Sequence, residues 1–132
     1  MSGPAQIYVD YLTEEGYRPV VDGDGDVTFK EEGRNYYIEV ATDDAPYFRL
    51  VFPNFWTIEN ADELARVTRA AGRATMRTKV AKVYVRSDGK DTVASVEMFL
   101  PKPEDFRAVF ARSMSALRAS VDNFVEAMRE GA

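Results

Sequence analysis

Apolar and polar residues alternate along several stretches of this chain, and elsewhere the apolar residues recur at helical spacing. Alternation is typical of strands that bury one face, whereas spacings of three and four residues are typical of helices with one apolar side. Alternation predicts strands at residues 26–31, 35–41, 47–52, 80–86 and 92–100, with a shorter strand at 18–21. Helical spacing predicts helices at about residues 4–15 and 61–77, and a long C-terminal helix that begins at Pro103.

Turn and capping residues support this order of elements. Asn60 stands three residues before Glu63, which is the spacing of a capping box at the start of a helix. Asp88 and Gly89 lie between the last two strands, and this pair is favoured in tight hairpins of type I′. The sequence therefore predicts an α+β fold with the order helix, three strands, helix, two strands and helix, in which the helices pack on an antiparallel sheet.

Length and composition fit one compact domain over residues 1–132. Hydrophobic residues make up 45% of the 132 residues, which is enough to bury a core without disulfides or metals. The sequence contains neither cysteine nor histidine, which excludes disulfides, thiolate metal sites and serine–histidine catalysis. We therefore expect no cofactor and no metal. We also expect a cytoplasmic protein, because we find no export signal and no apolar stretch long enough to cross a bilayer.

The charge is distributed unevenly along the chain. The net charge is -5, with -8 on residues 1–59 and +3 on residues 60–132. An acidic chain has no general attraction for phosphate backbones, so a nucleic-acid contact would require a local basic patch.

Carboxylates are the remaining candidates for acid–base chemistry. Most of them lie in turns or near helix ends, but Glu39 and Glu97 lie inside predicted strands. A half-buried strand needs polar residues on its outer face, so we interpret both as solvent-facing or ion-paired residues. A buried cluster of Glu39, Glu97 and a lysine around a pocket would instead indicate an enzyme.

The acidic run at residues 22–26 begins like a calcium-binding loop. Such a loop requires a glycine at its sixth position and a glutamate at its twelfth, and this chain has Val27 and Gly33 there. We therefore interpret the run as a hairpin turn. No glycine-rich run has the spacing of a phosphate-binding loop.

The predicted helix at 61–77 has two distinctive sides. Four arginines lie within one narrow arc: Arg66, Arg69, Arg73 and Arg77. They form either a solvated face or a surface that binds an acidic peptide, or a nucleic-acid backbone, through bidentate contacts. The other side carries small residues that allow another backbone to approach closely. We predict a homodimer interface there, formed by Leu64, Ala65, Thr68, Ala71 and Gly72.

The chain resembles the YbjN family, whose fold is shared with class I type III secretion chaperones. Four segments carry the resemblance: residues 13–40, 48–60, 78–85 and 103–128. The resemblance implies a non-enzymatic dimer that binds protein segments, as a chaperone-like or regulatory module. Secretion chaperones bind extended segments over apolar patches on the sheet and first helix, and the matching candidates here are Tyr8, Tyr11, Tyr36 and Tyr47.

Three hypotheses about function follow. The first is a homodimeric protein-binding module that uses a sheet edge, the tyrosines and the arginines, with no membrane contact. The second is an accessory factor that associates with nucleic acid, directly or through a nucleic-acid-binding protein. The third is an enzyme that works without histidine.

Overall fold

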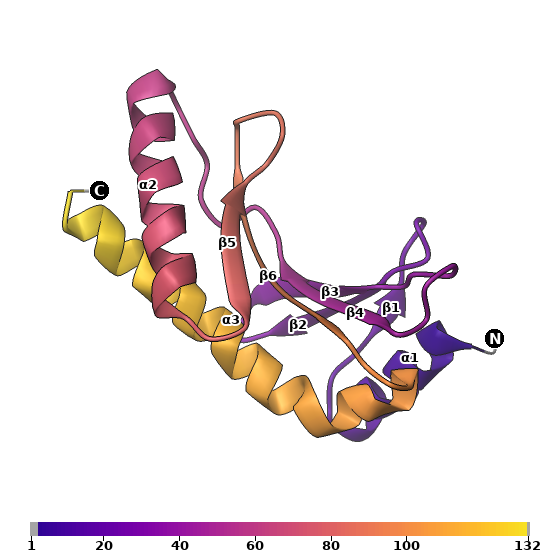
Figure 1. Ribbon diagram of the computed structural model, residues 1–132. Coiled ribbons are helices and arrows are strands. Elements are labelled where there is room, and N and C mark those ends of the chain that lie inside the picture. Colours follow the sequence, from indigo (N-terminus) through magenta and orange to yellow (C-terminus); the bar gives the residue numbers. More distant parts are fainter. Residues whose placement is uncertain (1–2, 132) are drawn as a thin grey trace. The chain divides into compact units, whose positions relative to one another are not determined.

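The structure is a computed structural model that describes residues 3–131 (Figure 1). Within this range there are three α-helices: α1 (Pro4–Glu14), α2 (Ala61–Arg77) and α3 (Phe106–Arg129), with a 3-10 turn, η1 (Pro103–Asp105), leading into α3. The strands are β1 (Val20–Val21), β2 (Val27–Glu31), β3 (Arg34–Glu39), β4 (Tyr47–Phe52), β5 (Ala81–Val85) and β6 (Thr92–Phe99). They form one antiparallel sheet with the order β1-β2-β3-β4-β6-β5.

This arrangement confirms the predicted α+β fold. The boundaries of α2 coincide with the prediction, and the backbone N–H of Glu63 donates to Oδ1 of Asn60 at 2.9 Å, as the capping signal indicates. The short strand predicted at 18–21 is reduced to β1, which begins after Pro19, a residue that has no N–H for a strand ladder. With β1 counted, four strands precede α2, which are the three strands of the predicted order and the short strand predicted before them.

The chain divides into two compact units. The first unit combines the residues up to Val51 with Glu97–Ala111, and the second combines Phe52–Val96 with the residues from Arg112 onward. The boundaries fall inside β4, β6 and α3 rather than in linkers. The single domain over residues 1–132 stays a prediction.

An aromatic cluster forms the core of the first unit. The ring of Phe106, at the start of α3, is fully buried and makes edge contacts with Tyr8 and Tyr11 of α1 at centroid distances of 4.7 and 5.0 Å. It also contacts Phe48 of β4 at 6.0 Å and Phe110 at 6.2 Å. Such pairs contribute about 0.5–1.5 kcal/mol each beyond their burial. The cluster therefore holds α1 and the start of α3 on one face of the sheet.

The β2–β3 hairpin sets which residues face that core. Its two-residue turn, Glu32 and Gly33, has φ of 50° and 79°, as a type I′ turn requires. The predicted Asp88–Gly89 turn differs, because Arg86 pairs with Asp91 around a longer loop, in which only Gly89 has a positive φ.

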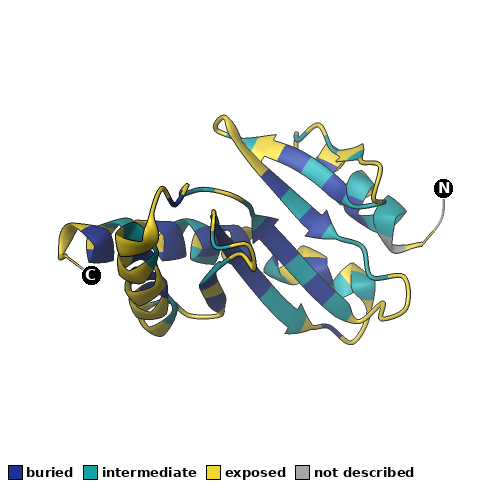
Figure 2. Ribbon diagram, turned by 90° about the horizontal axis from the view of Figure 1, so that it is seen from above, coloured by how far each residue is buried: buried dark blue, intermediate teal, exposed yellow. Residues whose placement is uncertain are grey.

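Figure 2 shows buried and less buried residues alternating along the strands. The buried residues of β2, β3 and β4 are Val27, Phe29, Tyr36, Ile38, Phe48, Leu50 and Val51.

In the second unit, small side chains allow α2 to pack closely on β5. The buried residues of α2 are Val67, Ala70, Ala71 and Ala74. Thr75 follows on the same side, and its hydroxyl accepts a hydrogen bond from the Val83 N–H at 2.8 Å and donates to the Val83 C=O at 3.2 Å. The hydroxyl therefore occupies backbone groups on the outer edge of β5 that would otherwise be open for pairing.

Val80, predicted as the first residue of a strand, instead lies in a tight turn. Its φ is 71°, and the Ala81 N–H donates to the Lys79 C=O at 2.7 Å across it. A positive φ is costly for a β-branched residue. Because of this turn the strand begins only at Ala81. The alternating pattern of the sequence does not reveal the turn.

None of the helices among residues 3–131 is both long enough and apolar enough to cross a membrane.

The bonds of Thr75 predict a measurable contribution to stability. We expect Thr75→Val to lower the free energy of unfolding by about 1–3 kcal/mol, because it leaves the Val83 N–H and C=O without their hydroxyl partner. Thr75→Ser keeps the hydroxyl and should retain most of the stability. Urea unfolding monitored by circular dichroism measures both. Equal stability of the valine variant and the wild type would contradict this role.

Candidate functional site

A polar network covers the face of the first unit's sheet opposite the aromatic core. Arg49 of β4 lies at its centre, with Nε 3.4 Å from Glu97 of β6 and Nη1 3.7 Å from Glu39 of β3. Nη1 also donates to the Tyr37 hydroxyl at 3.3 Å, and the Tyr47 hydroxyl donates to Glu97 at 2.6 Å. These five residues are half-buried. We call them the Arg49 network.

This network confirms that Glu39 and Glu97 are ion-paired residues. The cation between them is Arg49 rather than a lysine, and a guanidinium stays protonated and cannot act as a general base. The arrangement that would have indicated an enzyme, a pocket around Glu39, Glu97 and a lysine, is not what the described residues form. The two pockets described below are lined by other residues.

Tyr47 joins the network to an exposed aromatic residue. Its ring lies 6.0 Å from that of Phe99, whose side chain is 77% exposed. The pKa of the Tyr47 phenol is raised well above its ordinary value, mainly by burial and secondly by the hydrogen bond to Glu97. Tyr47 therefore remains a hydrogen-bond donor through neutral pH. The sequence pattern does not single out Phe99, because this residue lies at the end of a strand, where its exposure depends on what packs nearby.

The four tyrosines predicted to bind a partner lie in different environments. Tyr8 and Tyr36 are only 1% and 3% exposed. Their placement in a binding patch is therefore wrong for this structure: Tyr8 packs on Phe106, and Tyr36 stacks with Phe29. Tyr11 is half-buried beside Phe106, and Tyr47 lies on the open face. The structure therefore does not bring the four rings together.

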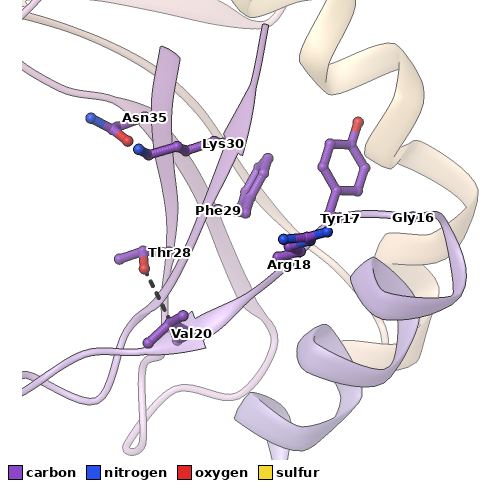
Figure 3. A pocket seen from close by; sticks show the side chains of 8 residues that line it. All are labelled: Gly16, Tyr17, Arg18, Val20, Thr28, Phe29, Lys30 and Asn35. Carbon is purple, nitrogen blue, oxygen red and sulfur yellow. Dashed lines mark hydrogen bonds between the residues drawn. The ribbon is translucent and has the colours of Figure 1, made fainter. Parts of the chain in front are cut away.

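A pocket of about 390 Å³ lies along the outer edge of β2, beyond the end of β1 (Figure 3). In Figure 3 the Phe29 and Tyr17 side chains lie on one side of β2, whereas Lys30 and Asn35 lie on the other. The pocket is therefore a concavity around a strand edge. Its lining residues are Gly16, Tyr17, Arg18, Val20, Thr28, Phe29, Lys30 and Asn35.

The backbone of Lys30 faces this pocket. Glu31 and Arg34 flank a two-residue turn and form a hydrogen-bonded pair, so the next pair, Lys30 and Asn35, directs its backbone groups away from each other. On its outer side β2 pairs with β1 only at Val27 and Thr28. The N–H and C=O of Lys30 therefore lie at an open edge that can pair with another extended segment.

The predicted arginine stripe lies along α2, where three of its members contact the end of α3. Arg77 is 3.1 Å and Arg73 is 3.9 Å from the Glu130 carboxylate, and Arg66 donates to the Met128 C=O at 3.4 Å. Cations near the C-terminal end of a helix interact favourably with its dipole. Arg69 is exposed. The stripe therefore has an internal structural role as well as exposed charge.

The residues predicted for a dimer interface are divided between two sides of α2. Ala65, Thr68 and Gly72 are exposed, and Figure 2 shows α2 as largely exposed. Ala71 is only 5% exposed and packs inside the second unit, so its assignment to an interface is wrong for this structure. Leu64 is half-buried and lines a second pocket of about 380 Å³ with Gly89.

The acidic run at residues 22–26 forms a turn through its own carboxylates. Oδ1 of Asp22 accepts from the backbone N–H groups of Asp24 and Asp26 at 2.9 and 3.0 Å. Oδ1 of Asp26 accepts from the Val40 N–H at 2.9 Å. These bonds fit the interpretation of the run as a hairpin turn.

Comparison with solved structures shows which known fold this is. The chain is similar to the crystal structure of YbjN from E. coli, a proposed transcription regulator, with a TM-score of 0.65 and 11% sequence identity. The match covers 98% of this chain and 94% of that one. The chain thus has the YbjN fold, as the sequence resemblance implies. No family of known sequences and no curated protein matches it.

The raised pKa of Tyr47 predicts a pH-dependent effect of its removal. Near neutral pH we expect Tyr47→Phe to lower the free energy of unfolding by about 1–2 kcal/mol, through the lost hydrogen bond to a carboxylate. A phenol whose folded-state pKa is raised contributes stability below its ordinary pKa of 10.0 and loses it as the pH rises further. The difference between wild type and variant should therefore shrink above that pH in urea titrations. A difference that stays constant with pH would contradict the assignment.

Proposed function

We propose that this chain is a non-enzymatic protein-binding module of regulatory or chaperone-like type, which pairs an extended segment of its partner with the open edge of β2. The observation that carries the proposal is the edge at Lys30, where backbone groups face a pocket of about 390 Å³. Strand addition of this kind obtains affinity from main-chain hydrogen bonds and specificity from side-chain pockets. Tyr17 and Val20, which line this pocket, would contact the segment's apolar side chains.

Three further observations support a binding role over catalysis. The two mid-strand carboxylates are engaged by Arg49. The chain contains no histidine or cysteine. Its structural neighbour is described as a proposed transcription regulator, although at 11% identity that likeness extends to the fold alone. The absence of cysteine also fits a location in the cytoplasm.

Association with nucleic acid is the weaker alternative. Phosphate binding requires cations that are free to contact the backbone. Arg66, Arg73 and Arg77 instead contact Met128 and Glu130. The overall charge of -5 also opposes association with a polyanion.

We include a homodimer in the proposal, formed through the exposed small residues of α2. Ala65, Thr68 and Gly72 lie about one helical turn apart and would allow two helices to approach closely. A glycine inside a helix lowers the stability of that helix. Packing within the chain does not require one at Gly72, because a Cβ there would meet nothing within 4 Å. Close approach of a second helix would explain it.

The edge of β2 can be closed selectively with proline. We expect Lys30→Pro to lower partner capture by about tenfold, since proline removes the outward N–H while the β2–β3 hydrogen bonds remain. Lys30→Ala keeps the N–H and serves as the matched control. Affinity capture from the source organism, compared by quantitative mass spectrometry, gives the measurement. Equal capture by a folded proline variant and the alanine variant would overturn strand addition.

The dimer has its own test. We expect the wild type to sediment at twice its mass of 14.9 kDa at micromolar concentration, and Gly72→Glu to sediment at 14.9 kDa because it places a charge in the interface. Gly72→Ala should leave the dimer intact, because a methyl group is small enough for close helix contact. A wild type found only near 14.9 kDa would refute the dimer.

A further inference from the structure

We propose that the open sheet face formed by the Arg49 network and Phe99 is a second contact surface, which docks a cationic protein segment carrying apolar side chains. This inference rests on the proposed protein-binding function and adds the chemistry of the partner. It concerns a different surface from the edge of β2, because the side chains involved come from β3, β4 and β6.

Phe99 provides the apolar contact. A phenylalanine that is 77% exposed keeps most of its ring in water, although burying it would be favourable. Tyr47 lies beside it at 6.0 Å, and Tyr37 lies on the same face through its contact with Arg49. Aromatic residues surrounded by polar groups are typical of protein interfaces.

Backbone hydrogen bonds beside Phe99 hold this residue in its exposed position. The N–H of Leu100, the next residue, donates to the Pro46 C=O at 2.7 Å, and the N–H of Tyr47 donates to the Asp44 C=O at 2.9 Å. The Asp44–Tyr47 turn therefore lies against the end of β6. A partner would meet an ordered surface and would lose little free energy in ordering it.

The charge around Phe99 selects a cationic partner. The Arg49 network contains two carboxylates, Glu39 and Glu97, for one guanidinium, and the side chain of Glu39 is 40% exposed. Asp43 and Asp44 are exposed in the adjacent turn. The first unit as a whole has 14 acidic and 6 basic side chains.

Acidic side chains outnumber the basic ones near Phe99. Lys102, three residues beyond it, is exposed, and the acidic residues Glu104 and Asp105 follow it in the chain. Arg49 is matched by the carboxylates on either side of it. Lys30 belongs to β2, which is separated from β4 by β3. An acidic segment would therefore be repelled here, whereas lysine or arginine side chains can approach the carboxylates while apolar neighbours cover Phe99.

Nuclear magnetic resonance of the full-length, isotope-labelled chain can test this inference with two synthetic peptides. One alternates lysine and leucine, and the other alternates glutamate and leucine. We expect the lysine peptide to shift the amide signals of Tyr37, Tyr47, Arg49, Glu97 and Phe99, with an affinity that falls as salt is added. The glutamate peptide should not bind this face.

Variants separate the apolar contact from the charge attraction in this recognition. Phe99→Ser should weaken binding of the lysine peptide by about tenfold, since it removes the exposed ring. The double variant Asp43→Asn with Asp44→Asn should weaken binding and reduce its dependence on salt. Met76→Ser is the matched control, because Met76 is an apolar residue that is 77% exposed, as Phe99 is, but belongs to α2 rather than to this face.

The outcomes distinguish this inference from the proposed function. Binding that Phe99→Ser leaves unchanged, equal binding of both peptides, or no binding of the lysine peptide would overturn the inference. Shifts confined to the edge of β2 would also overturn it, while leaving strand addition in place. Failure of the proposed function would appear instead in the capture experiment, where the proline and alanine variants of Lys30 would behave alike.

Discussion

The packing of Phe106 against α1 and β4 is the contact on which the rest of the first unit depends. Its ring is fully buried and contacts Tyr8, Tyr11, Phe48 and Phe110. Because strand side chains alternate between faces, fixing Phe48 on the core side places Tyr47 and Arg49 on the other side. The aromatic core and the Arg49 network are therefore two consequences of one strand register.

The edge of the sheet at β5 and the edge at β1 and β2 differ in how far their backbone groups are covered. At β5 the Thr75 hydroxyl bonds both the N–H and the C=O of Val83, so pairing with another strand is blocked there. At the opposite end β1 contributes only two residues and leaves the edge of β2 open at Lys30. Exposed strand edges are usually protected, and this difference is consistent with a use for the open one.

The order of elements could be predicted from the sequence because it follows from local spacing and capping, as the match of α2 shows. The environment of individual side chains could not. Tyr8 and Tyr47 are the same residue type, but the first is enclosed by Phe106 of α3 and the second lies on an open face. Thr75 and Phe99 depend on long-range packing in the same way. The pairing of Glu39 and Glu97 was predictable in kind, although only the sheet register identifies Arg49 as the partner.

A one-sided sheet in the first unit, with rings enclosed on one face and available to solvent on the other, is the central physical claim. Relaxation of aromatic ring protons by a soluble paramagnetic compound tests it most directly, because the effect reports how closely solvent approaches each ring. The account predicts strong relaxation for Phe99, which is 77% exposed, and little for Phe106 and Tyr8, which are 0% and 1% exposed. Protection of Phe99 equal to that of Phe106 would contradict it.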